Sequence, residues 1–404
     1  MSDNNRSRWA RLLHFFSQRK VILGVWILLA LIASAKQLLK GSYNNYLIFK
    51  YTFWHALDHL NMYLQYPGQY FDSNHYGPFF SVLIAPFAVL PDFLGATLWQ
   101  LANTLFLYWA ISKLPLKNSK IVAVYWIVVH EALTAMFSFQ INSSIAAMVI
   151  LTLCFIREKK DFWAACMIML GTFIKLYGIV GLAFFFFSRQ KPTFILSCIF
   201  WAVVFLCLPM LFFSPEYILQ SYQDWYVSLQ EKNLSNTTSN MQDISVMGMA
   251  RRMFHDPTIP NLPFLAGGLV LFLLPYLRFS LYKNAAFQMM LLASVLLFLV
   301  LFSSGSESPT YVIAFAGVAI WFALQEKPIK PLYVGLLIFA FILTSFSPTD
   351  LFPKVIREEI VRPYSLKALP CFLIWLAVLY DLLTSKFQST HLSPQASEEQ
   401  DSGD

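Results

Sequence analysis

The chain of 404 residues is 57% hydrophobic and only 13% charged, whereas an average soluble domain carries about 25% charged residues. Its mean hydropathy is +0.56, and apolar runs recur from Val21 to Leu383, which excludes a large soluble domain. The formal net charge of +7 falls mainly in short connectors between these runs, so it does not indicate a nucleic-acid partner. We therefore predict an all-α polytopic membrane protein with membrane lipids among its partners.

The first 20 residues are basic and amphipathic, which predicts a cytoplasmic segment. The apolar run that follows is too long for a signal peptide and lacks a clear cleavage site, so we interpret it as a retained span. Similar runs predict ten spans in all: Val21–Leu39, Phe93–Ile111, Ile121–Phe137, Ser143–Ile156, Phe194–Phe213, Phe264–Leu277, Ala285–Phe302, Tyr311–Leu324, Leu332–Phe346 and Ala368–Leu383. Together with two interrupted segments, residues 21–384 form one predicted domain of about 10 to 13 transmembrane helices.

Basic connectors set the predicted sidedness, because Lys and Arg are enriched in cytoplasmic loops. Both termini then lie in the cytoplasm of a plasma (inner) membrane protein, and four polar segments lie outside: 41–78, 214–263, 303–309 and 347–366. With this sidedness, neither Phe79–Leu90 nor Phe162–Phe187 can cross the membrane once as an ordinary span. We therefore interpret each as a re-entrant pair or broken helix. The alternative is that both segments cross once and the sidedness differs locally.

Aromatic and apolar residues recur at helical spacing within segment 214–263, as Tyr222, Trp225 and Leu229 illustrate. The pattern predicts a helix lying in the membrane interface, and an aromatic belt that only anchors the loop is the alternative. The acidic, Ser-rich segment 385–404 predicts a disordered cytoplasmic tail.

Common cofactor and metal motifs do not occur in the chain. It contains no Walker motif, no G-x-G-x-x-G, no H-E-x-x-H and no D-x-D pair that could chelate a divalent metal. The five cysteines lie in apolar runs without a C-x-x-C pair, which is typical of buried residues. We therefore expect neither a cofactor nor a metal site.

The polar, aromatic segment Gly41–Pro78 is the first candidate for chemistry. Polar side chains in a mostly apolar membrane protein are expected where they contact water or a ligand. Asp72 stands close to His75 and Tyr76, and it could accept a proton from a substrate hydroxyl. A turn-forming aspartate is the alternative. His55 and His75 are interpreted as hydrogen-bonding groups.

Further polar groups interrupt the apolar runs near their predicted outer ends. Glu131 lies about two helical turns before Gln140 and Asn142, and an acid within a span indicates a group that faces a cavity or a cation. A structural ion pair is the alternative. Lys175 separates two apolar half-segments and could bind a phosphate as a point charge, unless it snorkels to the interface.

Two more candidates lie in the predicted outer segments. Arg251 and Arg252 offer a second cationic site, because guanidinium groups grip phosphate through paired hydrogen bonds. Glu307 lies in a polar stretch between two spans. The candidates thus include cations for a phosphate, an acid to activate a hydroxyl, and aromatic rings for sugars and isoprenoid chains. This combination indicates sugar transfer from a lipid phosphate at the membrane surface.

The chain resembles a known family. The resemblance runs from Asn44 to Leu383 and is carried by Asn44-Asn45-Tyr46, Tyr63-Leu-Gln-Tyr-Pro67, Asp72…Tyr76-Gly-Pro78, Leu90-Pro91…Leu98-Trp99…Asn103, Phe139-Gln140-Ile-Asn142, Lys175-Leu-Tyr177 and Ser306-Glu-Ser-Pro-Thr-Tyr311. These patterns are similar to glycosyltransferase family 87, a branch of the GT-C membrane transferases that use polyprenyl-phosphate sugars.

The resemblance implies a GT-C fold with a catalytic first outer loop and inverting transfer of a hexose, often mannose, from a polyprenyl phosphate to a lipid or glycan acceptor. It adds Asn44, Asn45, Tyr177 and Tyr311 to the candidate binding residues. In such enzymes an aspartate soon after the first span acts as general base, but here Asn44 and Asn45 hold that place. An amide cannot accept the acceptor's proton at neutral pH, so either Asp72 takes the role or the chain is a divergent or inactive member.

Two other classes of function stay open at this point. A flippase or transporter of lipid-linked saccharides would favour inverted repeats, and we find no convincing internal repeat in the sequence. A glycan polymerase or ligase of the O-antigen type would depend on arginines in an outer loop.

Overall fold

The computed structural model describes residues 11–239, 241–387 and 391–393. Over these residues the chain is helical, and its only extended pairing is an isolated antiparallel bridge between Leu116 and Leu392. The first half contains α2 (Arg19–Leu39), α3 (Asn44–Leu57), α4 (Phe80–Ala88), α5 (Asp92–Ser112), α6 (Asn118–Phe137), α7 (Asn142–Arg157), α8 (Asp161–Lys175), a 3-10 segment (Tyr177–Phe187) and α9 (Lys191–Cys207).

The second half begins with α10 (Pro215–Asn236), which confirms a helix in segment 214–263. It continues with α11 (Val246–Met253), α12 (Asn261–Leu273), α13 (Ala285–Leu301), α14 (Tyr311–Ala323) and α15 (Pro331–Phe339). A π-helical turn (Ala340–Phe346), the short α16 (Lys354–Ile356), a second π-helical turn (Arg357–Val361) and α17 (Ala368–Thr384) complete it.

The core is formed by helices that are apolar on every face. All residues of α13 from Ala285 to Leu297 are buried, as are those of α14 from Tyr311 to Trp321. A helix without a polar face is stable only when neighbouring helices or lipid surround it. Here α6, α7 and α17 pack against these two helices.

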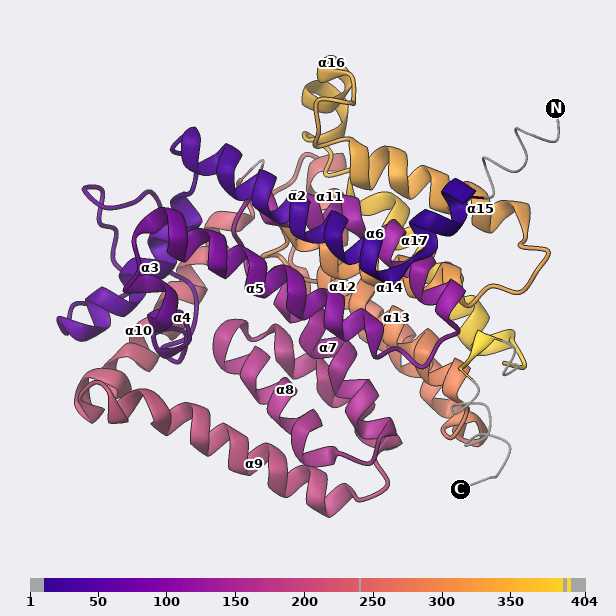
Figure 1. The fold of residues 1–404 in the computed structure, drawn as a ribbon, viewed down its shortest axis with the longest axis horizontal. Coiled ribbons are helices and arrows are strands. Elements are labelled where there is room, and N and C mark those ends of the chain that lie inside the picture. Colours follow the sequence, from indigo (N-terminus) through magenta and orange to yellow (C-terminus); the bar gives the residue numbers. More distant parts are fainter. Residues whose placement is uncertain (1–10, 240, 388–390, 394–404) are drawn as a thin grey trace.

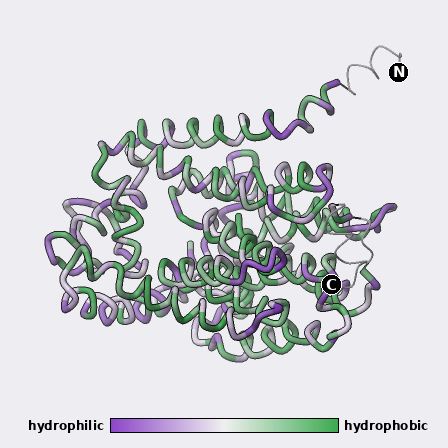
Figure 2. Tube along the Cα trace, turned by 60° about the horizontal axis from the view of Figure 1, so that its bottom comes forward, coloured by the Kyte–Doolittle hydropathy of each residue, from purple (hydrophilic) through white to green (hydrophobic). Residues whose placement is uncertain are grey.

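Outer helices carry the apolar surface that a membrane protein requires. On α9, the side chains of Leu196, Ile199, Phe200 and Val203 are each about half exposed or more. Figure 2 shows apolar residues along most of the helical path, with hydrophilic stretches concentrated in the connections. Such a surface suits lipid rather than water.

Three helices among the described residues are long and apolar enough to cross a membrane: Arg19–Leu39, Asn118–Phe137 and Lys191–Leu211. Seven further apolar helices have 10–17 residues, below the ~20 residues of an ordinary span. The structure thus supports a helical membrane protein, and the predicted total of crossings stays a prediction.

Helices α2 and α5 run along the length of the molecule, and α3, α4 and α10 gather at one end (Figure 1). We call this the site end. The segment predicted as a polar loop, Gly41–Pro78, contains α3 and is therefore partly helical. The predicted interruption of Phe162–Phe187 is present as well, because α8 ends at Lys175 and a 3-10 segment follows.

Part of the predicted tail is packed against the bundle, at the end remote from the site. Leu392 is fully buried, and Ser393 donates its backbone N–H to the carbonyl of Pro115 at 3.1 Å. Asn284 donates to the carbonyl of Phe387 at 3.0 Å. Residues 385–387 and 391–393 are thus ordered parts of the fold, and the remainder of the predicted tail lies outside the described residues.

Candidate active site

A cavity of about 420 Å³ opens at the site end. Segments far apart in the sequence contribute its walls, and most of the lining residues lie in the predicted outer segments. The lining residues include eight of the predicted site residues: Asn45, Asp72, His75, Tyr76, Gln140, Lys175, Tyr177 and Glu307. The lining combines polar and charged groups with apolar side chains such as Ile48, Phe49 and Leu229, and the size suits a small ligand.

The break between α8 and the 3-10 segment places Lys175 at this cavity. Leu176 has a φ of +26°, a conformation that is costly for a branched side chain, and it reverses the chain direction. The two arms of the turn lie so close that a Cβ at Gly178 would stand 2.3 Å from the backbone nitrogen of Thr172. Glycine is therefore required for the tight turn that presents Lys175.

The ammonium group of Lys175 contacts an amide and two aromatic rings. It donates a hydrogen bond to Asn142 Oδ1 at 3.1 Å. It lies 4.7 Å from the ring centre of Tyr177 and 5.9 Å from that of Tyr76. Among the described residues no carboxylate lies within ion-pair distance of Lys175, so its charge remains available to an anionic ligand.

The loop before α4 is joined to the same turn through its backbone. Gly77 donates its N–H to the carbonyl of Ile174 at 3.0 Å. A Cβ at Gly77 would stand 2.2 Å from the carbonyl oxygen of Phe173, so no larger residue fits. This close approach sets Tyr76 and His75 beside Lys175.

Asp72 stands at the mouth of the cavity with a φ of +73° and a side chain that is 53% exposed. One carboxylate oxygen accepts from the Nζ of Lys232 at 3.3 Å, and the other accepts the backbone N–H of Ser73 at 2.9 Å. The turn geometry expected as an alternative is therefore present. The structure leaves the predicted catalytic role of Asp72 untested.

His75 is a partly buried, neutral hydrogen-bonding group. Its Nδ1 lies 2.8 Å from the hydroxyl oxygen of Ser228, and its carbonyl accepts from Trp225 Nε1 at 2.9 Å. Burial, reinforced by the ammonium groups of Lys232 and Lys175, lowers the pKa of His75 to about 4, although Asp72 opposes the shift. The imidazole is therefore uncharged at neutral pH.

A chain of hydrogen bonds connects Lys175 with Glu307 along the cavity. Lys175 donates to Asn142 Oδ1, and Asn142 Nδ2 donates to Gln140 Oε1 at 2.5 Å. Gln140 Nε2 then donates to Glu307 Oε2 at 2.9 Å. All three bonds run in one direction, from the cation to the carboxylate, and we refer to them as the amide relay.

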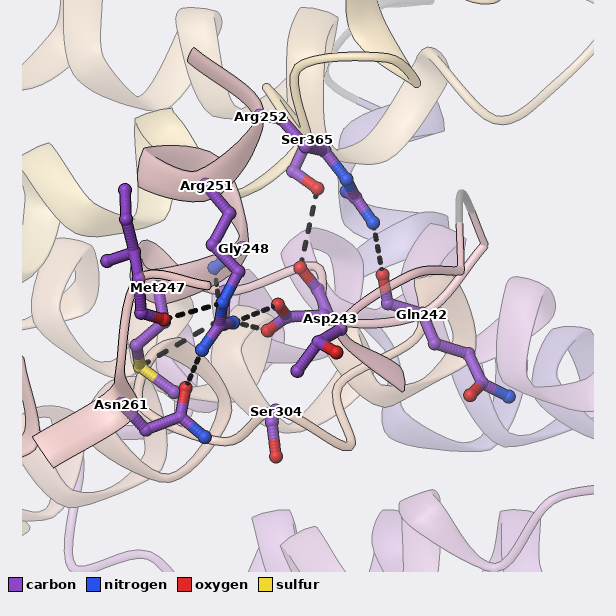
Figure 3. A network of polar contacts seen from close by, with 12 residues as sticks. Gln242, Asp243, Met247, Gly248, Arg251, Arg252, Asn261, Ser304 and Ser365 are labelled. Atoms are coloured by element: carbon purple, nitrogen blue, oxygen red, sulfur yellow. Dashed lines mark hydrogen bonds and ion pairs between the residues drawn. The ribbon is translucent and has the colours of Figure 1, made fainter. Parts of the chain in front are cut away.

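Arg251 and Arg252 support the cavity wall and do not line the cavity. Arg251 is buried and forms an ion pair with the buried Asp243, as Figure 3 shows, and it also donates to Asn261 Oδ1. Arg252 donates to the carbonyl of Gln242 at 2.6 Å. These contacts fix the segment that contains Gln242. The side chain of Gln242 lines the cavity, and its Nε2 lies 3.4 Å from Glu307 Oε1.

Glu131 also lies outside the cavity. Its carboxylate is fully buried and forms an ion pair with Lys367 at 3.2 Å, which corresponds to the structural ion pair named as the alternative. Lys367 also donates to the carbonyl of Ser308 at 3.1 Å and lies over the ring of Tyr311. The pair therefore fixes the backbone next to Glu307.

The other predicted residues have structural partners. Asn44 exchanges two hydrogen bonds with the backbone of Phe71, which closes the loop. His55 is buried and lies 2.7 Å from Gln69 Oε1. Tyr311 is buried and donates to the carbonyl of Ile244 at 2.8 Å. None of these three lines the cavity.

One wall of the cavity was not predicted from the sequence. Trp225, Leu229, Lys232, Asn233 and Asn236 of α10 all line it. Their spacing places them on one helical face, and the same periodicity had predicted the helix. A signal was thus available, because Lys232 and Asn236 extend the aromatic face with polar groups.

Among the described residues, no three His, Cys, Asp or Glu side chains are grouped so that they could hold a metal ion.

A comparison with known families decides the affiliation. A model of glycosyltransferase family 87 matches residues 74–304, which is more than half of the chain and includes most of the cavity lining. The chain belongs to glycosyltransferase family 87. No curated protein matches this family-87 chain. Membership indicates a glycosyltransferase, which needs a sugar donor and an acceptor.

Proposed function

We propose that this family-87 glycosyltransferase moves a hexose, such as mannose, from a polyprenyl-phosphate donor to a lipid or glycan acceptor on the outer face of the plasma membrane. The observation that carries the proposal is the cavity itself, which brings a cation without a carboxylate partner, two carboxylates and several amides together in an apolar helical protein.

Each part of the cavity suits one part of this reaction. Lys175 would bind the donor phosphate, since an ammonium group is a point charge for an anion. The rings of Tyr76, Tyr177 and Trp225 lie at the cavity and would pack against the hexose or the first isoprene units. A lipid donor also agrees with the absence of nucleotide-binding motifs from the sequence.

Inverting transfer requires a carboxylate that accepts the proton of the attacking hydroxyl. Asp72 and Glu307 both line the cavity, and the sequence had favoured Asp72. Asn45 lines it as well and donates to the carbonyl of Ser138 at 2.7 Å, so the residue at the usual position of the base acts here as a donor.

The reaction can be tested with the full chain in proteoliposomes supplied with radiolabelled polyprenyl-phosphate mannose or polyprenyl-phosphate glucose. We expect loss of label from the lipid phosphate and its appearance in a new glycoside when membrane lipid extract supplies acceptors. Movement of intact donor across the bilayer without bond cleavage would reject a transferase and favour a flippase.

A further inference from the structure

Two carboxylates line the cavity, and their surroundings differ. The Asp72 carboxylate accepts from an ammonium group, that of Lys232, and from a backbone N–H, and more than half of its side chain is exposed. Its negative charge is therefore balanced within the protein and is open to water. Both oxygens of this carboxylate thus already have partners within the protein.

Glu307 has neutral partners instead. Gln140 and Gln242 each donate one amide N–H to its carboxylate, at 2.9 Å and 3.4 Å. Among the described residues no Lys, Arg or His lies within ion-pair distance of Glu307. Glu307 also caps the helical turn before α14, where its backbone N–H donates to the hydroxyl of Thr310. Amide donors orient a carboxylate without supplying a positive charge, so Glu307 is held in place at the cavity.

The amide relay connects this carboxylate with the cation. Asn142 and Gln140 stand between Lys175 and Glu307, so the two charges cannot collapse into a direct ion pair. Each amide has only one orientation that satisfies both neighbours. The relay thus presents a cation and a carboxylate at separate places of one cavity, as a reaction between a phosphate donor and a hydroxyl acceptor requires.

Glu307 lines the same cavity as Asn45, and residues 138–140 join the two. Asn45 binds the carbonyl of Ser138, and Gln140, two residues later, binds Glu307. Phe139 between them has a φ of +55°, and its carbonyl accepts from Trp99 Nε1 at 2.9 Å. A left-handed backbone at a bulky residue indicates a locally fixed turn. This turn connects Ser138, the partner of Asn45, with Gln140, the partner of Glu307.

We infer that Glu307, supplied from the loop after α13, is the general base of this chain in place of the missing aspartate. The inference rests on the proposed function. The Glu307 carboxylate takes the proton of the acceptor hydroxyl, and the acceptor oxygen forms a bond to the anomeric carbon. The bond between that carbon and the phosphate oxygen breaks, its electron pair leaves with polyprenyl phosphate, and Lys175 faces the resulting charge.

Glu307→Gln tests the role, with Asp72→Asn as the rival and Glu216→Gln on exposed α10 surface as the control. Turnover of polyprenyl-phosphate mannose or polyprenyl-phosphate glucose, whichever the wild type uses, and binding of polyprenyl monophosphate are measured for each full-length protein. We expect Glu307→Gln to lose at least about 100-fold in turnover and to bind polyprenyl monophosphate within threefold of wild type. Asp72→Asn should keep more activity than Glu307→Gln.

A pH profile separates a base from a residue that only shapes the cavity. The acidic limb of kcat/KM should persist in Glu307→Asp and disappear from the residual activity of Glu307→Gln. Turnover of Glu307→Gln within tenfold of wild type would overturn the inference, as would its failure to bind polyprenyl monophosphate. A wild-type protein that transfers no hexose rejects the proposed function instead, so the two failures are distinguishable.

Discussion

Two sets of charged residues near the cavity have different surroundings. In the wall, Arg251 pairs with Asp243 and Lys367 pairs with Glu131, and all four side chains are at most 4% exposed. In the cavity, Lys175 and Glu307 contact only amides, hydroxyls and aromatic rings among the described residues. Charges that neutralise each other hold the wall in place, whereas charges separated by amides remain available to a ligand.

The comparison predicts the largest loss of stability when a wall pair is broken. Arg251→Met leaves the carboxylate of Asp243 buried without a cation, which should cost about 3–5 kcal/mol. Thermal unfolding of the detergent-purified protein measures the change. Lys160→Ala, which removes an exposed pair with Glu158, is the control and should cost no more than about 1 kcal/mol. Equal losses in both variants would contradict the distinction between wall and surface charges.

A smaller effect, restricted to acid, is expected at His75. Its pKa of about 4 in the folded state lies below the ordinary histidine value of 6.5, so folding favours the neutral ring. The contribution to stability is complete above pH 6.5 and is lost as the pH falls toward 4, up to about 3 kcal/mol at 1.36 kcal/mol per pKa unit.

His75→Gln removes this titration and should flatten the dependence of the unfolding midpoint on pH between 6.5 and 4. His59→Gln, at an exposed position near the start of the same loop, should keep the wild-type slope. An unchanged slope in His75→Gln would show that protonation of His75 does not oppose folding.

The smallest change in stability is expected in the cavity, together with a large change in binding. Lys175→Ala removes one hydrogen bond and no ion pair, so unfolding should change by no more than about 1.5 kcal/mol. Affinity for polyprenyl monophosphate should fall about 10- to 100-fold, as expected for a hydrogen bond to a charged group. Lys191→Ala, at the opposite end of the molecule, should leave affinity unchanged; an unaltered affinity in Lys175→Ala would reject the phosphate role.

Sequence patterns predicted the helices well, because long apolar runs leave a membrane chain few alternatives. The break at Lys175 was predicted from a charge within such a run, and α8 ends there. The helix α3 lies within the segment predicted as a polar outer loop, and its bounds were not predicted. Local composition therefore located the segment and did not give its structure.

Only some of the predicted site residues line the cavity. The others were misplaced because their partners are distant in the sequence. Lys175, Gln140 and Glu307 meet as expected of polar groups on one side of the membrane. An arginine next to an outer helix has the same local sequence signature whether it faces a ligand or a buried aspartate. For Glu131, the partner Lys367 is 236 residues away, and only the fold reveals the pair.

The bridge between Leu116 and Leu392 has a practical consequence for the handling of this protein. Composition alone recommends trimming the chain after α17 to remove a flexible end. Such a truncation would delete Leu392, which is fully buried, and leave the backbone groups of Pro115 and Lys117 without their partners. Keeping all residues through Ser393 and placing any affinity tag after them would preserve these contacts between residues 115–117 and 391–393.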